Sequence, residues 1–346
     1  MKIGKHTISS ITDPLIIAEV SGNHNGSLDI ALKLVDAAAQ AGIKVIKLQT
    51  YTPDTITMNH DGKEFLIEDR KSLWFGRTLY NLYKEAYTPW EWQKEIFLYA
   101  SRMGVQCFSS VFDESSVDFL ESIECPAYKI ASQECVHIPL IEYVAQTGKP
   151  IVISTGMASL GEIETAINAF SRKSSAAYSI MKCTSQYPAD PRNSNVLTVP
   201  YMKKIFGCEV GLSDHTLGVG ASLAAIAHGA TFIEKHITLS RKDGGVDGAF
   251  SLEPNEFKML NDEASRVKLS LGKVRFGPVE DEIASLQGRR SIYAVADIKA
   301  GEKFTKDNIQ VIRPSGGIEP KSYRLILGKS AISDIKRGTP LNWDLM

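Results

Sequence analysis

Short apolar runs alternate with amphipathic segments over about the first 275 residues of the chain. Each run has the length and the β-branched content of a buried strand, and amphipathic segments separate the runs. The eight runs, each with its first residue, are LIIAEV (Leu15), VIKLQT (Val45), QCFSSV (Gln106), AYKIAS (Ala127), PIVIST (Pro150), YSIMKCT (Tyr178), EVGLSD (Glu209) and TFIEKH (Thr231).

The segment SLDIALKLVDAAAQAG shows the helical pattern best. Ser27 is a good N-cap residue, and Gly42 follows the last turn, where a glycine commonly ends a helix. Helical spacing places one apolar face on Leu28, Ala31, Leu32, Val35 and Ala39.

Eight strand–helix units in this order predict a closed parallel (β/α)₈ barrel over residues 1–275. An open, doubly wound sheet is the alternative. It is disfavoured because no G-x-G-x-x-G motif follows the first strand.

The pattern changes near Arg275. Residues 276–288 are polar and typical of a linker, and residues 289–346 predict short strands and turns in a small domain. The run DIKAG from Asp297 recurs as DIKRG from Asp334, and each copy predicts a strand end followed by a glycine turn. About sixty residues fold only marginally alone, so this domain is expected to pack on the barrel or on a second subunit.

Composition limits the classes of partner. The chain has 346 residues and a formal net charge of -1, which gives no reason to expect nucleic acid or an anionic membrane surface as a partner. The first ten residues lack the apolar stretch of a secretory signal, and no apolar run is long enough to span a membrane. The five cysteines form no C-x-x-C pair and are typical of buried free thiols, so we expect a cytoplasmic protein.

Two histidines, His215 and His236, end the seventh and eighth predicted strands. Neighbouring strands lie about 5 Å apart, so both imidazoles could bind one divalent ion and leave positions open for water and substrate. Nitrogen and oxygen ligands suit Mn²⁺, Mg²⁺, Co²⁺ or Zn²⁺, with Glu134 or Glu19 as an added carboxylate. The alternative is that each histidine is a hydrogen-bonded core residue.

A second group of polar residues at the strand ends combines lysines and serines. Lysines are costly inside an apolar barrel unless they are paired, and lysines beside hydroxyl groups suit a small dianion such as a phosphate ester. A structural ion pair, for instance between Lys129 and Glu134, is the alternative, and a Schiff-base lysine is a further one. The group consists of Lys47, Lys129, Ser132, Ser154 and Ser213.

The connection after the second strand is long and aromatic, running from about Tyr51 to Trp92. Long loops at the strand carboxyl ends of a barrel usually shape the substrate pocket. The aromatic residues Trp74, Tyr80, Tyr83, Trp90 and Trp92 could contact a sugar or could pack the insertion together, and the sequence leaves both open.

The blocks at the strand ends resemble those of the sialic acid synthase family. In order they are IAEVSGNHNGS, IKLQTY, CFSSVFD, YKIASQE, VISTGMA, KCTSQYP, VGLSDHT and IEKHITL, and they cover nearly the whole barrel. The tail, from RRSIYAVADIKAGE through IRPSGGI, resembles the antifreeze-like or SAF domain that ends these enzymes.

Within the family, the chain is most similar to the pseudaminic acid synthases, on the segments LWFGRTLYNLYKEAYTPWEW and GGVDGAFSLEPNEF. The block KCTSQYP carries Ser185 where neuraminate-type relatives usually have asparagine. The resemblance implies a synthase that joins phosphoenolpyruvate to 2,4-diacetamido-2,4,6-trideoxy-L-altrose, with a legionaminate or N-acetylneuraminate synthase as the alternative.

The resemblance also implies roles for individual residues. His215 and His236 match metal ligands, with Mn²⁺ as the expected ion and Mg²⁺ or Co²⁺ possible. Lys47, Lys129, Ser132, Ser154 and Ser213 match positions that hold phosphoenolpyruvate. Six further residues match family positions near the sugar, the metal or the reacting water, namely Glu19, Gln49, Glu134, Ser185, Tyr187 and Asp247.

The tail contributes one expected site residue. Arg313, in IRPSGG, matches an arginine that enters the partner subunit's site, which implies a domain-swapped homodimer. Two rival functions remain at this level: an aldolase that forms an imine with free pyruvate through Lys47 or Lys129, and a non-catalytic carbohydrate-binding protein.

Overall fold

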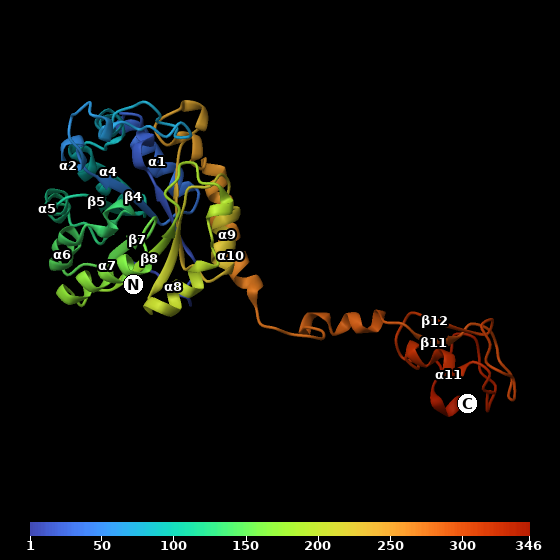
Figure 1. Cartoon of the computed structure of the whole chain (residues 1–346). Coiled ribbons are helices and arrows are strands. Elements are labelled where there is room, and N and C mark those ends of the chain that lie inside the picture. Colours follow the sequence, from blue (N-terminus) through green and yellow to red (C-terminus); the bar gives the residue numbers. More distant parts are fainter. The chain divides into compact units, whose positions relative to one another are not determined.

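A computed structural model describes residues 1–346, and the chain separates into two compact units, Met1–Gly272 and Lys273–Met346. The larger unit is a closed barrel of eight parallel strands surrounded by helices (Figure 1). The order of strands around the barrel is β10-β3-β4-β5-β6-β7-β8-β9, so each strand pairs with its neighbours in sequence and β10 closes the barrel on β3.

The eight predicted strands are confirmed as barrel strands. They are β3 (Leu15–Glu19), β4 (Val45–Thr50), β5 (Gln106–Val111), β6 (Tyr128–Ile130), β7 (Ile151–Ser154), β8 (Tyr178–Cys183), β9 (Glu209–Asp214) and β10 (Phe232–His236). Their residues are almost all buried because the barrel interior covers one face and the helices cover the other. The open-sheet alternative is wrong.

The helices of the barrel lie between these strands and after the last one. They are α1 (Leu28–Gln40), α4 (Trp90–Arg102), α5 (Glu114–Ser122), α6 (Ile138–Gln146), α7 (Leu160–Lys173), α8 (Thr198–Phe206), α9 (Gly220–Ala227) and α10 (Pro254–Leu271). Two further short helices, α2 (Pro53–Ile56) and α3 (Leu79–Ala86), lie within the long connection after β4.

Helix α1 begins and ends as the sequence indicates, although its buried face is rotated. The Ser27 hydroxyl caps the helix by accepting from the backbone N–H of Ile30. The buried residues are Ala31, Leu34, Val35, Ala37 and Ala38, whereas the expected Leu28, Leu32 and Ala39 are only half-buried. The pattern of helical spacing was right, but small alanines face the barrel where the sequence interpretation placed leucines.

A short antiparallel pair, β1 (Lys2–Ile3) and β2 (His6–Thr7), precedes the barrel. Ile3 and Ile8 are fully buried in the barrel core, and a side chain on Gly4 would collide with Gln106 at the start of β5. The pair therefore covers the end of the barrel where the strands begin. The opposite end, where the strands terminate, stays open to the loops.

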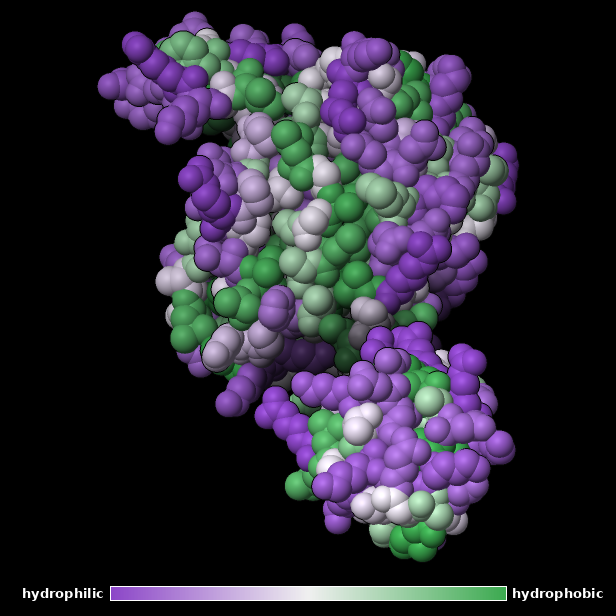
Figure 2. Space-filling view, turned by 90° about the vertical axis from the view of Figure 1, so that its right-hand side faces the viewer, coloured by the Kyte–Doolittle hydropathy of each residue, from purple (hydrophilic) through white to green (hydrophobic).

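The face of the larger unit that Figure 2 shows carries a band of apolar side chains between polar regions. The exposed apolar residues of α8 and its N-terminal flank are Leu197, Tyr201 and Ile205, which share one face of the helix. No helix of the structure is both long enough and apolar enough to cross a membrane.

The smaller unit has its own core, formed by buried residues such as Ile292, Phe304, Ile309, Ile326 and Leu341. Its elements are short: β11 (Ser291–Ala294), β12 (Ile309–Ile312) and α11 (Tyr323–Ile326). This matches the expectation of short strands and turns in place of long helices.

The two DIK copies of the smaller unit lie side by side. Ile298 and Ile335 form an antiparallel bridge and exchange both backbone hydrogen bonds. Lys299 pairs with Asp334 at 2.8 Å, and Lys336 pairs with Asp297 at 2.9 Å. Each aspartate also accepts a backbone N–H from the turn of the other copy.

Candidate active site

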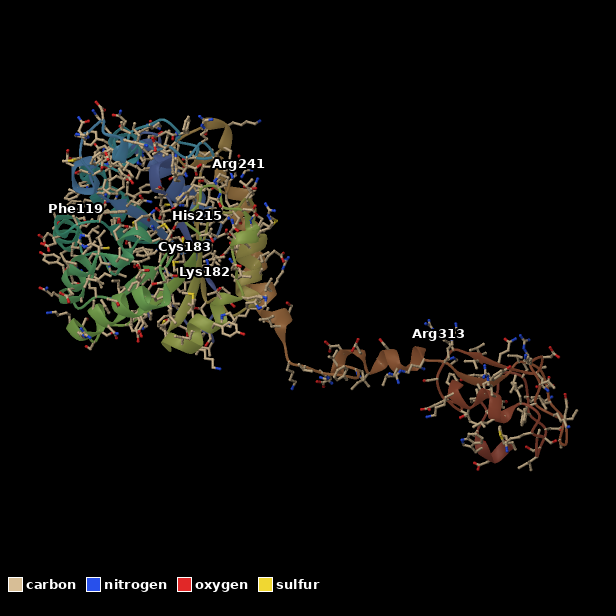
Figure 3. All side chains as sticks on the ribbon, viewed as in Figure 1. Phe119, Lys182, Cys183, His215, Arg241 and Arg313 are labelled. Atoms are coloured by element: carbon tan, nitrogen blue, oxygen red, sulfur yellow. The ribbon has the colours of Figure 1, made fainter.

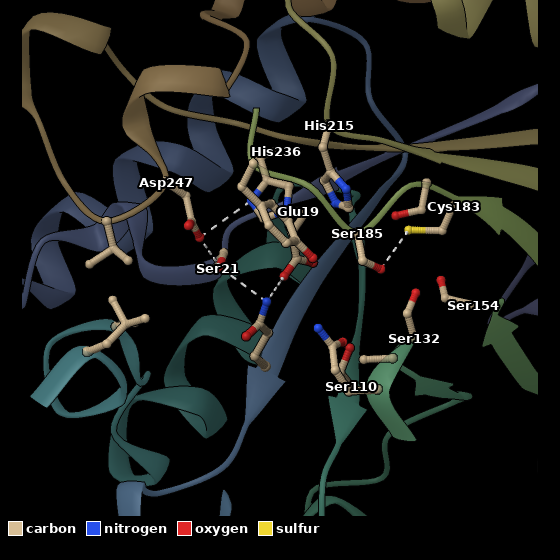
Figure 4. A pocket seen from close by; sticks show the side chains of 18 of the residues that line it. Glu19, Ser21, Ser110, Ser132, Ser154, Cys183, Ser185, His215, His236 and Asp247 are labelled. Carbon is tan, nitrogen blue, oxygen red and sulfur yellow. Dashed lines mark hydrogen bonds and ion pairs between the residues drawn. The ribbon is translucent and has the colours of Figure 1, made fainter. Parts of the chain in front are cut away.

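A cavity of about 610 Å³ opens at the carboxyl ends of the barrel strands. Every predicted site residue of the barrel lines it: Glu19, Lys47, Gln49, Lys129, Ser132, Glu134, Ser154, Ser185, Tyr187, Ser213, His215, His236 and Asp247. Many of them surround the same space in Figure 4. Arg313 lies in the smaller unit (Figure 3).

Two lysines and two glutamates form a buried charged layer at the floor of the cavity. The ammonium of Lys47 lies 2.7 Å from Glu19 Oε2 and 3.7 Å from Glu234 Oε1. The ammonium of Lys129 lies 2.8 Å from Glu234 Oε2. Charges alternate along this chain, so each buried ion has a partner and no charge is left uncompensated.

The alternation sets the ionisation of the layer. Burial alone would raise the pKa of Glu234, but the neighbouring Lys129 and Lys47 lower it to about 2. Burial alone would lower the pKa of Lys47, but Glu19 and Glu234 outweigh burial and raise it. Both groups are therefore charged at neutral pH. Burial has the opposite effect at the two ends of the layer, where it raises the pKa of Glu19 and lowers that of Lys129.

Glu234 is the site residue that the sequence interpretation did not assign. The alternative of a structural ion pair is found with a different partner, because Lys129 pairs with Glu234 and not with Glu134. The signal was present in the sequence: Glu234 stands two residues before His236, and side chains two apart on a strand share a face.

Hydroxyl groups line the wall beside Lys129. Ser132 Oγ accepts the backbone N–H of Gly156 at 3.2 Å, and Ser154 Oγ is buried without a hydrogen-bond partner. A Cβ on Gly156 would lie 2.3 Å from Ser185 Oγ and 2.8 Å from Ser132 Oγ, so only glycine leaves this polar pocket open. The free hydroxyl of Ser154 and the adjacent ammonium groups together suit a small anion.

The two histidines face each other across the opposite side of the cavity, with ring centroids 5.3 Å apart. His215 Nδ1 lies 3.0 Å from the Thr184 carbonyl and must donate to it, which leaves Nε2 free as a ligand atom. His236 Nδ1 is buried without a hydrogen-bond partner, and Asp247 Oδ2 lies 3.6 Å away.

The donor set fits a divalent metal. Burial holds the pKa of His236 well below its usual range. The imidazole of His236 is therefore neutral, which is the form that binds metal. No group of three or more histidine, cysteine, aspartate or glutamate side chains has metal-ligand spacing, so two imidazoles are the protein ligands on offer.

Glu134 has no cationic partner, whereas Glu19 and Glu234 each pair with a lysine. Burial raises its pKa to about 7, and its Oε2 atom is buried without a hydrogen-bond partner. A carboxyl group that is half protonated near neutral pH can both give and take a proton.

The long connection after β4 supplies the outer wall and is divided between two roles. Trp74 and Tyr83 line the cavity, where the Trp74 indole donates to the Val246 carbonyl at 2.9 Å. Trp90 stacks on Phe119 and Trp92 packs edge-on against His24, away from the cavity. Apolar side chains complete the wall, namely Ile56, Ile67, Leu79, Leu82 and Val246.

Comparison with known proteins identifies the family. The model of the NeuB family matches residues 34–276, and that of the SAF domain matches residues 289–345. The chain belongs to the NeuB family. It is 41% identical over 326 residues to a pseudaminic acid synthase of Campylobacter jejuni, covering 94% of each protein. It is 39% identical to that of Helicobacter pylori, covering 96% of the chain and 97% of the relative.

A solved structure of the family shares the fold. The N-acetylneuraminic acid (sialic acid) synthetase of Leptospira borgpetersenii, in complex with citrate, has a TM-score of 0.71 and 30% identity and covers 83% of the chain and 94% of that structure. The expected family, the barrel followed by an SAF domain, and the assignment as an enzyme of the transferase type are confirmed.

Proposed function

We propose that this enzyme condenses phosphoenolpyruvate with 2,4-diacetamido-2,4,6-trideoxy-L-altrose and water, giving pseudaminic acid and phosphate. One observation carries the proposal: the cavity combines anion-suited groups, Lys47, Lys129 and Ser154, with apolar side chains such as Ile67 and Leu82 from the connection after β4. The first group suits phosphoenolpyruvate, and the apolar side chains suit a sugar with a methyl group. The identities of 41% and 39% to pseudaminic acid synthases support the same substrate.

The lysines and serines would orient phosphoenolpyruvate. Lys129 and Lys47 would meet its phosphate and carboxylate, while Ser132, Ser154 and Ser213 would donate hydroxyl hydrogen bonds. Their contribution is positional, since holding two reactants in line removes most of the entropic cost of the encounter. No imine is needed, because the enol carbon of phosphoenolpyruvate is already nucleophilic and both lysines have glutamate partners.

A divalent metal, with Mn²⁺ the expected ion and Mg²⁺ or Co²⁺ possible, would be held by His215 and His236 and would polarise the sugar's aldehyde oxygen. Asp247 lies beside His236 and would orient that imidazole or accept a sugar hydroxyl. Gln49 and Tyr187 line the same side of the cavity, where they would contact the sugar.

The reaction forms one carbon–carbon bond and breaks one carbon–oxygen bond. C3 of phosphoenolpyruvate attacks the aldehyde carbon, water adds to C2, and the bond from C2 to the phosphate oxygen breaks as phosphate leaves. Glu134 is the proposed proton carrier in place of Glu19, since Glu19 pairs with Lys47 whereas Glu134 titrates near neutral pH. It would take a proton from the attacking water.

Product analysis tests this function. The purified enzyme is given phosphoenolpyruvate, Mn²⁺ and either the 6-deoxy sugar or N-acetylmannosamine, and products are identified by mass spectrometry. We expect a higher kcat/KM for the 6-deoxy sugar, because burying its methyl group is worth about 1 kcal/mol. A higher kcat/KM for N-acetylmannosamine would instead make the enzyme an N-acetylneuraminate synthase, and a legionaminate precursor is the third substrate to compare.

We also propose a domain-swapped homodimer in which Arg313 reaches the partner's cavity. The loop that carries Arg313 is well held: Ser291 Oγ donates to the Pro314 carbonyl at 2.9 Å and accepts the Gly317 N–H at 3.0 Å. A Cβ on Gly317 would lie 2.7 Å from the Ile292 carbonyl oxygen, so no side chain fits at this position. A rigid loop of this kind can present a guanidinium group at low entropic cost.

A further inference from the structure

Ser21 has an unusual backbone for a residue with a side chain. It follows β3 at the cavity rim, is buried, and has a φ of 46° in the left-handed region. That region is strained for a residue with a Cβ, whereas glycine adopts it freely. A serine at this position therefore calls for a reason that lies in its hydroxyl group.

The hydroxyl joins two parts of the cavity. It donates to Asp247 Oδ2 at 2.5 Å and accepts from Gln49 Nε2 at 3.1 Å. Gln49 Nε2 also donates to Glu19 Oε1 at 2.8 Å. The direction is fixed, because a carboxylate only accepts and the serine has one proton to give. Figure 4 shows this chain from Asp247 through Ser21 to Glu19.

Each end of the chain meets a different part of the chemistry. Asp247 Oδ2, the acceptor of the Ser21 bond, lies 3.6 Å from His236 Nδ1. Glu19 Oε2 lies 2.7 Å from the ammonium of Lys47. Ser21 thus hydrogen-bonds both to Asp247, which lies beside the His236 imidazole, and to Gln49, which donates to Glu19.

We infer that Ser21 is a positioning residue, which fixes Asp247 against His236 and Gln49 against Glu19 so that both sides of the cavity keep one geometry. This rests on the proposed function, in which His236 binds the metal and Gln49 faces the sugar. Loss of such an outer partner typically lowers metal affinity or activity by about 10–100-fold.

Two variants of Ser21 separate this role from a structural one. Ser21→Gly removes the hydroxyl and also relieves the left-handed backbone, whereas Ser21→Ala removes the hydroxyl and keeps the strained backbone. Both should lower kcat/KM for the sugar, and the affinity for Mn²⁺ measured by calorimetry, by about tenfold or more. Their melting temperatures should differ, with the glycine variant more stable than the alanine variant.

Glu124→Gly is the matched control. Glu124 has a φ of 59°, is exposed and does not line the cavity. Its glycine variant should gain stability with unchanged kinetics and unchanged Mn²⁺ affinity. Together the three variants show whether relieving a left-handed backbone by itself affects the reaction.

The inference is overturned if Ser21→Gly keeps wild-type kcat/KM and Mn²⁺ affinity, or if activity across the variants simply follows melting temperature. Failure of the proposed function looks different: the wild-type enzyme would form no product from phosphoenolpyruvate with any of the sugars. Mn²⁺ affinity then still decides the role of Ser21, and equal affinity in wild type and both variants would refute it.

Discussion

Lys129 and Glu234 form an ion pair of 2.8 Å inside the barrel, and both side chains are at least 95% shielded from water. Such a pair is a poor source of stability compared with apolar packing, but removing one partner is strongly destabilising. Because the pair lies in the cavity lining, we expect it to serve substrate binding.

Glu234→Gln should lower the free energy of unfolding by about 3–5 kcal/mol, because Lys129 would keep its buried charge without a partner. Added phosphate should raise the melting temperature of this variant more than that of the wild type, since the anion would replace the missing carboxylate. Glu209→Gln is the control, because its pair with Lys203 is more exposed. If phosphate raises the melting temperatures of Glu234→Gln and of the wild type equally, Lys129 does not bind the anion.

Metal dependence follows from the two facing histidines. Treatment with a chelator should abolish phosphate release, and Mn²⁺ should restore it. His236→Ala should bind Mn²⁺ at least about tenfold more weakly in calorimetry. His228→Ala, which changes an exposed histidine after α9, should bind normally. Full activity of the metal-free enzyme would contradict the assignment.

Glu134 should make the stability of the protein depend on pH. Its carboxyl pKa is about 7 in the folded protein against 4.5 as the ordinary value, so the folded state holds the extra proton between these limits. Stability should therefore fall as pH rises from 4.5 to 7, by about 1–3 kcal/mol. Denaturant unfolding at several pH values should show this loss in the wild type and not in Glu134→Gln. Parallel pH curves for the two proteins would show that Glu134 is not the group responsible.

Oxygen labelling tests which bond of phosphoenolpyruvate breaks. With ¹⁸O in the bridging position, attack of water at C2 should deliver the label to the released phosphate, as read by mass spectrometry. Label in the sugar product would mean that water attacks phosphorus instead.

Shared sites in a dimer can be tested by mixing two inactive variants. An Arg313→Ala chain and a His236→Ala chain should regain up to about a quarter of wild-type activity after subunit exchange, because the mixed dimer has one intact site. Arg324→Ala, an exposed arginine of the same unit, should stay fully active alone. If exchange is demonstrated and activity does not return, Arg313 acts in its own chain or outside the site.

Much of the barrel could be predicted because buried parallel strands leave a local signal. Runs such as VIKLQT and TFIEKH are short, apolar and β-branched, and each ends in polar residues that the barrel brings to one rim. The start of α1 also has a local signal, because the Ser27 hydroxyl accepts from the backbone N–H only three residues later in the chain.

The contacts within the site could not be predicted from local patterns. Glu234 meets Lys129 across the barrel, 105 positions apart in the chain, and Ser21 meets Asp247 across 226 positions. Local patterns also could not show which aromatic residues of the long connection face the cavity. Trp74 faces it because its indole donates to the Val246 carbonyl, a partner far away in sequence. Pairing of this kind depends on the closure of the barrel and on side-chain rotamers.

The crossed ion pairs of the smaller unit have a consequence for its stability. Asp297 stabilises the turn that follows Asp334, and Asp334 stabilises the turn that follows Asp297, so each half completes the other. The contacts around the two copies are therefore related by a local pseudo-two-fold symmetry. Replacing either aspartate would remove the cap from the other copy's turn, so a single substitution would weaken the half of the unit in which it does not lie.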